Sequence, residues 1–282
     1  MPNTGQKPQE LIFTTRDGLR IAADFYPAYP TLKKGRGFDG TQGLSPVKAL
    51  GKRGFKKTLV VFSPGFAKYK DAPPMGEICR FLTRYGDVLC PDFRGTGRSE
   101  GRYGCGAYEH FDLEAVLKGT PGYRKRILIG LSLGSYISLR TAYEFPKLVD
   151  RLLLVSVPTN FEGIIKTWGP LRQGWAIATH WESLWQRLHS VHSIFFRWDY
   201  PFRPKPDASK MVRRLKIPIS FLAGGKDRLV VKSLTRKVYE KASTPKSWTE
   251  IPEGNHAEFM YMENKKSFKA WLRRSIVGNW DY

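Results

Sequence analysis

Short, continuous apolar runs recur along the chain and constrain its fold more than any other feature. They lie at residues 58–62, 87–90, 126–130, 152–157 and 217–222. Strands buried on both faces of a parallel sheet have this character, because neither face meets water. Between them lie stretches with a helical spacing of apolar residues, at residues 75–85, 132–145 and 268–277. Strands that alternate with helices predict an α/β fold with a mainly parallel sheet flanked by helices.

The N-terminal part departs from this alternation. Residues 10–15 and 19–26 are alternating runs joined by a turn at residues 16–18. The turn contains an Asp-Gly pair, which favours a tight hairpin because glycine tolerates a positive φ. We therefore expect an antiparallel strand pair before the parallel part of the sheet.

Residues 159–206 interrupt the alternation a second time. This segment carries five of the eight tryptophans. One helical face is formed by Ile177, Trp181, Leu184, Trp185 and Leu188. Such a face either packs on the main domain as part of the core or belongs to a cap over an apolar pocket. The two interpretations are compatible, since one face can dock on the domain while another lines the pocket. We predict a core domain of residues 1–158 and 207–282 with a helical cap inserted at residues 159–206.

The chain has 282 residues with 47 Lys and Arg against 25 Asp and Glu, a formal net charge of +22. Such a surplus attracts phosphate-rich partners, although it also serves solubility. The densest basic segment is residues 33–57, a Gly-rich stretch that reads as a solvated loop or as an electrostatic docking arm. No helix-turn-helix, zinc-finger or RNP pattern accompanies it. An anionic membrane surface or an acidic acyl carrier is therefore favoured over nucleic acid as the partner.

The composition also excludes several classes of protein. The three cysteines, Cys79, Cys90 and Cys105, are too few and too irregularly spaced for a disulfide framework or a zinc site. No run of about 18 apolar residues is present, and residues 1–10 lack the apolar core of a secretory signal. We expect a soluble, cytoplasmic protein with reduced thiols, peripheral to a membrane if its basic surface meets one.

A G-x-S-x-G sequence at residues 130–134 carries the chemistry. It stands between an apolar strand and a helical stretch, and this context matters more than the five letters. In a strand, sharp turn and helix, the serine is held in a strained conformation with its hydroxyl at the edge of the sheet. Amides at the N-terminus of the helix then lie close enough to stabilise an oxyanion. Ser132 is the candidate nucleophile.

A serine needs a base, and the base needs an orienting carboxylate. The five histidines are His110, His180, His189, His192 and His256. His256 stands in a turn-rich loop directly after the run at residues 247–251, where it can reach the carboxyl edge of the sheet. Asp227 follows the apolar run at residues 217–222 in the same way. The chain order Ser132, Asp227, His256 is the order of a hydrolase triad on this kind of fold.

Four segments resemble segments of the α/β-hydrolase superfamily. They are the D-x-R-G-x-G-x-S segment at residues 92–99, the elbow at 130–134, the acid loop at 222–230 and the histidine loop at 254–256. The resemblance covers nearly the whole chain apart from the basic segment, and it implies the α/β-hydrolase fold with no metal and no organic cofactor. For residues 92–99 we favour structural bracing of the site floor over a catalytic role.

The resemblance also indicates an oxyanion hole. In relatives with a His-Gly pair after the third strand, the amide of the following residue forms half of the hole. Here Ser63, Pro64, Gly65 and Phe66 occupy that place, with Pro64 instead of the histidine. The resemblance therefore implies the backbone N–H groups of Phe66 and Leu133 as donors.

A serine at the elbow separates the chain from the dehalogenase and epoxide-hydrolase branches, which use a carboxylate nucleophile. We expect an esterase or lysophospholipase-like serine hydrolase that cleaves a carboxylic ester, with an acyl, lipid-like or thioester substrate, through an acyl-enzyme. A serine peptidase or aminopeptidase, an acyltransferase and a non-catalytic basic binding protein stay open as alternatives. Acyl-chain length, leaving group and oligomeric state are also open.

Overall fold

The structure is a computed structural model that describes residues 7–28, 58–66, 68–160, 199 and 202–278. Within these residues the chain forms an eight-stranded sheet with the order β1-β2-β4-β3-β5-β6-β7-β8. The strands are β1 Gln9–Thr14, β2 Arg20–Tyr26, β3 Thr58–Ser63, β4 Asp87–Pro91, β5 Lys125–Leu131, β6 Arg151–Val155, β7 Ile219–Gly224 and β8 Lys246–Ile251. β1 and β2 pair antiparallel, and β2 pairs antiparallel with β4. From β4 to β8 all pairs are parallel, which confirms the predicted α/β class.

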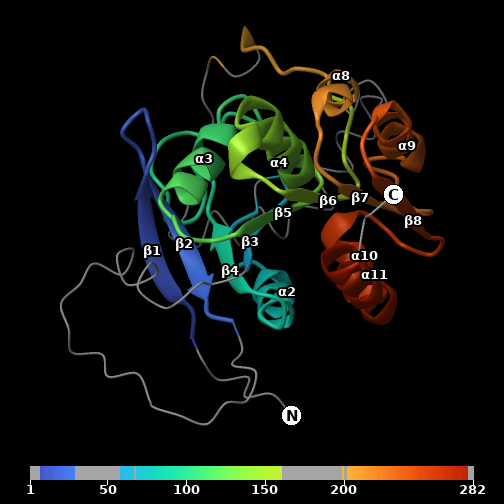
Figure 1. Cartoon of the computed structure of the whole chain (residues 1–282), viewed down its shortest axis with the longest axis horizontal. Coiled ribbons are helices and arrows are strands. Elements are labelled where there is room, and N and C mark those ends of the chain that lie inside the picture. The colour runs from blue at the N-terminus through green and yellow to red at the C-terminus, as the bar shows by residue number, and fades with distance from the viewer. Residues whose placement is uncertain (1–6, 29–57, 67, 161–198, 200–201, 279–282) are drawn as a thin grey trace.

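Helices cover both faces of this sheet (Figure 1). One face carries α3 His110–Lys118, α4 Leu133–Glu144, α8 Ala208–Met211 and α9 Lys232–Lys241. The other carries α2 Met75–Leu82, α10 Ala257–Glu263 and α11 Lys265–Val277. Short 3₁₀ turns lie at η1 Pro146–Leu148 and η3 Val212–Arg214.

Two apolar layers result, one on each face of the sheet. The first includes Leu139 of α4 and Val238 of α9, and the second Ile78 of α2 and Trp271 of α11. The central strands supply both layers, and β6 is buried at every position. This two-sided burial explains why the strands read as continuous apolar runs rather than alternating ones.

Most predicted elements are confirmed, with shifted ends that have physical causes. The hairpin is β1 and β2, and the closing helix is α11. β6 ends at Val155 rather than at residue 157, because Ser156 adopts a positive φ of 49°. β7 begins at Ile219 rather than at residue 217, and Pro218 before it has no N–H for the ladder.

The predictions for the basic segment 33–57 and for most of the cap at residues 159–206 lie outside the described residues. In the part of the chain that is described, no helix has the length and apolar character needed to span a bilayer.

Candidate active site

Ser132 stands at the turn between β5 and α4, as predicted. Its φ of 53° and ψ of −119° lie in a region that residues with a side chain rarely adopt. The turn is held by neighbours, since the Ser132 N–H donates to Val155 O at 2.9 Å and Ser135 Oγ donates to the Val155 carbonyl at 2.8 Å. The strained backbone projects the Ser132 hydroxyl beyond the carboxyl end of β5.

The two glycines of the G-x-S-x-G sequence are required by close approach. A Cβ on Gly130 would lie 2.4 Å from the backbone of Ser135, and one on Gly134 would lie 2.3 Å from the carbonyl oxygens of Ser63 and Pro64. Real Cβ atoms do not approach backbone so closely. Gly134 therefore allows the loop after β3 to pack directly on the first turn of α4.

The structure brings the three predicted triad side chains together. Ser132 Oγ lies 2.8 Å from Nε2 of His256. Nδ1 of the same ring lies 3.0 Å and 2.9 Å from the two carboxylate oxygens of Asp227. The three residues follow β5, β8 and β7, whose carboxyl ends meet at one edge because the strands are parallel.

Asp227 is held by donors other than the imidazole. Its Oδ1 accepts the backbone N–H groups of Leu229 at 3.0 Å and Val230 at 2.9 Å, and its Oδ2 accepts the Ser156 hydroxyl at 2.7 Å. These bonds fix the plane of the buried carboxylate and with it the orientation of His256. Ser156 follows β6 at the same sheet edge. No motif marks Ser156 in the sequence, and its place directly after an apolar run is the one signal that points to it.

The ion pair shifts both pKa values. Burial alone would lower the pKa of His256, but the charge and hydrogen bond of Asp227 outweigh it and raise the pKa above its ordinary value of 6.5. Burial opposes ionisation of Asp227, yet the charge and hydrogen bond of His256, together with Ser156, hold its pKa below 3.8. The carboxylate therefore stays ionised while the imidazole titrates.

A second ion pair lies beside the triad and was also missed. Lys68 Nζ is 3.5 Å from Oε1 of Glu258, whose side chain is almost fully buried. A Cβ on Gly65 would lie 3.6 Å from Oε2 of Glu258 and 3.7 Å from Cβ of Ser132, so the carboxylate faces the loop before Phe66. The Glu258 charge raises the pKa of His256, and the Lys68 charge lowers it. No motif marks either residue in the sequence.

The two residues expected to supply the oxyanion donors lie on α4 and on the loop after β3. Leu133 is the first residue of α4, so its N–H is one of the amides that have no acceptor within the helix. Phe66 follows Gly65 on the loop that packs against α4, and its ring contacts Tyr103 edge-on at a centroid distance of 5.8 Å. Leu133 therefore directly follows the serine, and Phe66 directly follows a glycine whose Cβ would lie 3.7 Å from Cβ of Ser132.

The segment at residues 92–99 has the features of a brace. Asp92 is fully buried and accepts the backbone N–H groups of Lys70 at 2.7 Å and Arg98 at 2.9 Å. Burial raises its pKa to about 6 despite these donors. Arg94 is also fully buried and binds Asp112 and Asp17. These bonds tie the segment to α3, to the turn of the hairpin and to the loop at Lys70 rather than to the Ser132, His256 and Asp227 cluster.

The remaining candidates lie apart from the triad or cannot be placed. His110 is buried in α3, where desolvation and nearby arginines lower its pKa to about 3. His180, His189 and His192 lie outside the described residues. Among the residues that the structure does describe, no group of three His, Cys, Asp or Glu side chains could hold a metal ion.

Solved structures of hydrolases share the fold of this chain. An esterase from Pyrococcus furiosus superposes with a TM-score of 0.67 at 19% identity, covering 97% of this chain and 92% of that one. A hydrolase from Pseudomonas aeruginosa gives 0.65 at 19% identity, covering 98% and 100%. An esterase from a Rhodococcus species gives 0.64 at 17% identity, covering 95% and 98%. At these identities the likeness concerns the fold.

Similarity in sequence is more local. Uncharacterised proteins of Mycobacterium bovis and Mycobacterium tuberculosis are 39% identical over 74 residues, which is 24% of this chain and 20% of their length. Residues 60–268 match the sequence profile of the Alpha/beta hydrolase family, a range that reaches from β3 into α11 and contains the Ser132, Asp227 and His256 cluster. This chain belongs to the Alpha/beta hydrolase family.

Proposed function

We propose that this chain is a serine hydrolase that cleaves carboxylic esters through an acyl-enzyme. The observation that carries the proposal is the continuous contact from Ser132 Oγ to His256 Nε2 at 2.8 Å and from His256 Nδ1 to Asp227 at 2.9 Å. A hydroxyl becomes a useful nucleophile only when a base takes its proton, and this base is oriented by a buried carboxylate.

In the proposed reaction, Ser132 Oγ attacks the ester carbonyl carbon while its proton passes to Nε2 of His256. The Asp227 carboxylate stabilises the imidazolium that forms. When the tetrahedral intermediate collapses, the bond to the alkoxy oxygen breaks and the imidazolium protonates the departing alcohol. A water molecule then gives a proton to His256 and attacks the carbonyl carbon of the acyl-enzyme. When this second tetrahedral intermediate collapses, the bond to Ser132 Oγ breaks, His256 returns the proton to Ser132, and the acid is released.

The tetrahedral oxyanion needs donors in place before the reaction. In the proposal these are the backbone N–H groups of Leu133 and Phe66. Each such donor contributes roughly 3–4 kcal/mol to lowering the barrier in comparable sites. The positive end of α4 points toward the same position, because Ser132 is its N-cap residue.

We propose an acyl or lipid-like ester as the substrate class, with thioesters included. The support is the tryptophan-rich segment at residues 159–206, which in this proposal forms a helical cap on the core of residues 1–158 and 207–282. Aromatic and aliphatic walls favour apolar acyl groups. Esterases among the structural relatives agree with this class.

The test compares Ser132→Ala with Ser233→Ala, a control that removes an exposed hydroxyl from α9. We expect the wild type and the control to hydrolyse short p-nitrophenyl esters and to react with a fluorophosphonate probe. Ser132→Ala should lose both properties while its thermal melting stays unchanged. Ester hydrolysis by Ser132→Ala at the wild-type rate would refute the assignment of Ser132 as the nucleophile.

The substrate class is tested with a panel of acyl lengths carrying ester, thioester or peptide amide leaving groups. We expect kcat/KM to rise with acyl length and to exceed the value for the matching amide. Faster cleavage of the amide would favour a peptidase, and transfer of the acyl group to an added alcohol in preference to water would favour an acyltransferase. A wild-type protein that fails to react with the fluorophosphonate would favour a binding function.

A further inference from the structure

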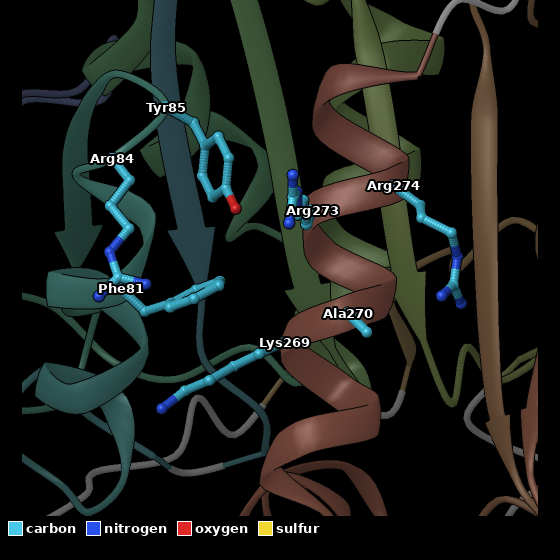
Figure 2. A pocket seen from close by; sticks show the side chains of 7 residues that line it. All are labelled: Phe81, Arg84, Tyr85, Lys269, Ala270, Arg273 and Arg274. Atoms are coloured by element: carbon cyan, nitrogen blue, oxygen red, sulfur yellow. The ribbon is translucent and has the colours of Figure 1, made fainter.

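A basic groove lies between α2 and α11, on the face of the sheet that these helices cover. Its cavity of about 650 Å³ is lined by Phe81, Tyr85, Ala270 and four cationic side chains, those of Arg84, Lys269, Arg273 and Arg274. Figure 2 shows Lys269 reaching from α11 toward Phe81 on α2, with Arg273 between the helices. Segments far apart in the sequence therefore join into one cationic surface.

α11 is amphipathic in an unusual way, because its outer side is basic without any acid. Over Lys265–Val277 it carries five cations and no Asp or Glu. Its apolar side chains Phe268, Trp271, Leu272 and Ile276 are buried against the sheet. A helix with a basic outer side and a buried apolar side offers its charge outward, toward an anionic partner.

Few of these cations are neutralised within the described residues. Glu77 of α2 binds Lys265 at 2.8 Å and Lys269 at 3.2 Å, and it is the acid that the structure pairs with this surface. Arg84, Lys266, Arg273 and Arg274 form no ion pair in the described part of the chain. The groove thus presents a net positive charge rather than a closed network.

The Phe81 ring of the groove makes cation–π contacts with two of the groove's own cations. The Arg84 guanidinium lies 5.0 Å from the centroid of the Phe81 ring, and Lys269 Nζ lies 5.5 Å from it. Tyr85 packs edge-on against the same ring at 5.9 Å. A ring occupied by two cations and a neighbouring tyrosine is not open for stacking on a nucleobase, which is the main contribution of aromatic residues to single-strand binding.

Exposed apolar side chains flank the cations. Met262 is 49% exposed and lines a second cavity together with Lys265 and Glu77. Val277 is 62% exposed and lies four residues after Arg273, on the same side of the helix. Nucleic acid would require the charges alone, whereas a lipid surface takes up both cations and apolar side chains.

We propose that this face of α2 and α11 docks on membranes that contain anionic phospholipids. The cations of the groove would contact lipid phosphates and carboxylates, and Met262 and Val277 would enter the region between the head groups and the acyl chains. The proposal does not depend on the proposed hydrolase activity, because its residues lie outside the Ser132, His256 and Asp227 cluster.

The test is co-sedimentation of the full chain with vesicles of phosphatidylcholine alone and of phosphatidylcholine with phosphatidylserine. The variant is Arg84→Gln/Arg273→Gln/Arg274→Gln. The matched control, Lys210→Gln/Lys216→Gln/Lys241→Gln, removes the same number of exposed charges away from the groove. Each cation near an anionic surface contributes somewhat less than a factor of ten, so the groove variant should bind about 100-fold more weakly. We expect the control to bind within about threefold of the wild type.

Several outcomes would overturn the proposal. Equal binding to vesicles without phosphatidylserine would remove the role of anionic lipid. An equal loss in the groove variant and its control would assign the effect to net charge rather than to this face. Binding of a DNA duplex that the groove variant weakens, with vesicle binding unchanged, would assign the face to nucleic acid. Thermal melting and turnover of a soluble p-nitrophenyl ester establish that each variant is folded.

A second variant addresses the apolar contribution. Met262→Ser/Val277→Ser leaves the charge unchanged, so vesicle binding should weaken about tenfold at high salt, where the electrostatic attraction is screened. A loss confined to low salt would contradict insertion of these side chains.

Discussion

Replacing Asp227 by Asn tests whether the carboxylate fixes the histidine tautomer. Two backbone N–H groups, those of Leu229 and Val230, donate to Oδ1 at 3.0 Å and 2.9 Å. In Asp227→Asn the amide oxygen keeps the Oδ1 position to accept both, which places the NH₂ group at the Oδ2 position, the nearer of the two to His256 Nδ1 at 2.9 Å against 3.0 Å. The imidazole would then accept at Nδ1 and carry its proton on Nε2, where it cannot take the proton of Ser132.

The magnitude follows from the cost of the opposite orientation. Turning the amide oxygen to the imidazole leaves two buried N–H groups without an acceptor, at about 1–3 kcal/mol each. The productive orientation then costs about 2–6 kcal/mol, which corresponds to a loss between about 30-fold and about 25,000-fold. The centre of this range, about 4 kcal/mol, corresponds to a loss of roughly 1,000-fold, and loss of the carboxylate charge lowers the rate further, so we expect kcat to fall roughly 1,000- to 10,000-fold.

Kinetics with p-nitrophenyl acetate and the rate of fluorophosphonate labelling measure the effect. Ser156→Ala removes one donor to the carboxylate without changing the tautomer, so it should cost only about tenfold. Asp71→Asn, at an exposed position, should leave kcat unchanged. The ¹⁵N shifts of the His256 ring report directly which nitrogen carries the proton. If Asp227→Asn keeps kcat within about tenfold of the wild type, the reasoning on the tautomer is refuted.

Three further predictions concern the surroundings of the site. Asp227 raises the pKa of His256, so the acid limb of the pH profile of kcat/KM should lie above pH 6.5. Glu258→Gln removes a charge that also raises this pKa, so the acid limb should move to lower pH. A shift of the acid limb to higher pH would contradict this effect of the Glu258 charge. Gly134→Ala would place its Cβ 2.3 Å from the Pro64 carbonyl oxygen, so the free energy of unfolding, measured by thermal unfolding, should fall by at least about 1–3 kcal/mol. A wild-type melting temperature would show that the loop after β3 moves away from α4 at no cost. Arg94→Met leaves Asp112 and Asp17 without their cation, so the free energy of unfolding, measured in urea, should fall by about 3–5 kcal/mol. A decrease of under about 1 kcal/mol, which is typical of an exposed ion pair, would contradict the prediction.

The sequence was sufficient for the sheet and for the proximity of Ser132, Asp227 and His256, because both depend on local patterns. Buried parallel strands appear as apolar runs, and residues that follow such runs converge at one edge of the sheet. α3 escaped detection because Asp112 and Glu114 are buried in it, held by ion pairs with Arg94 and Arg16, so its polar residues do not mark an outer face. α10, at Ala257–Glu263, is too short for a periodic signal.

The other omissions arise from tertiary packing. Ser156 acquires its role only when β6 and β7 lie side by side, and Lys68 meets Glu258 across 190 residues of sequence. The basic groove likewise forms only through tertiary packing. The densest basic segment in the sequence is residues 33–57, whereas the groove draws its cations from the turn after α2 and from α11.

The proposed nucleophile and its proposed base follow strands that are held with very different strength. Ser132 follows β5, which has a parallel neighbour on each side. His256 follows β8, which among the described strands pairs with β7 alone and is half-buried along most of its length. Fraying begins at such outer strands, at a free-energy cost below that of global unfolding. On gentle warming the base would therefore leave the serine while the centre of the sheet is still intact. Catalytic competence should fade reversibly, several degrees before the molecule melts.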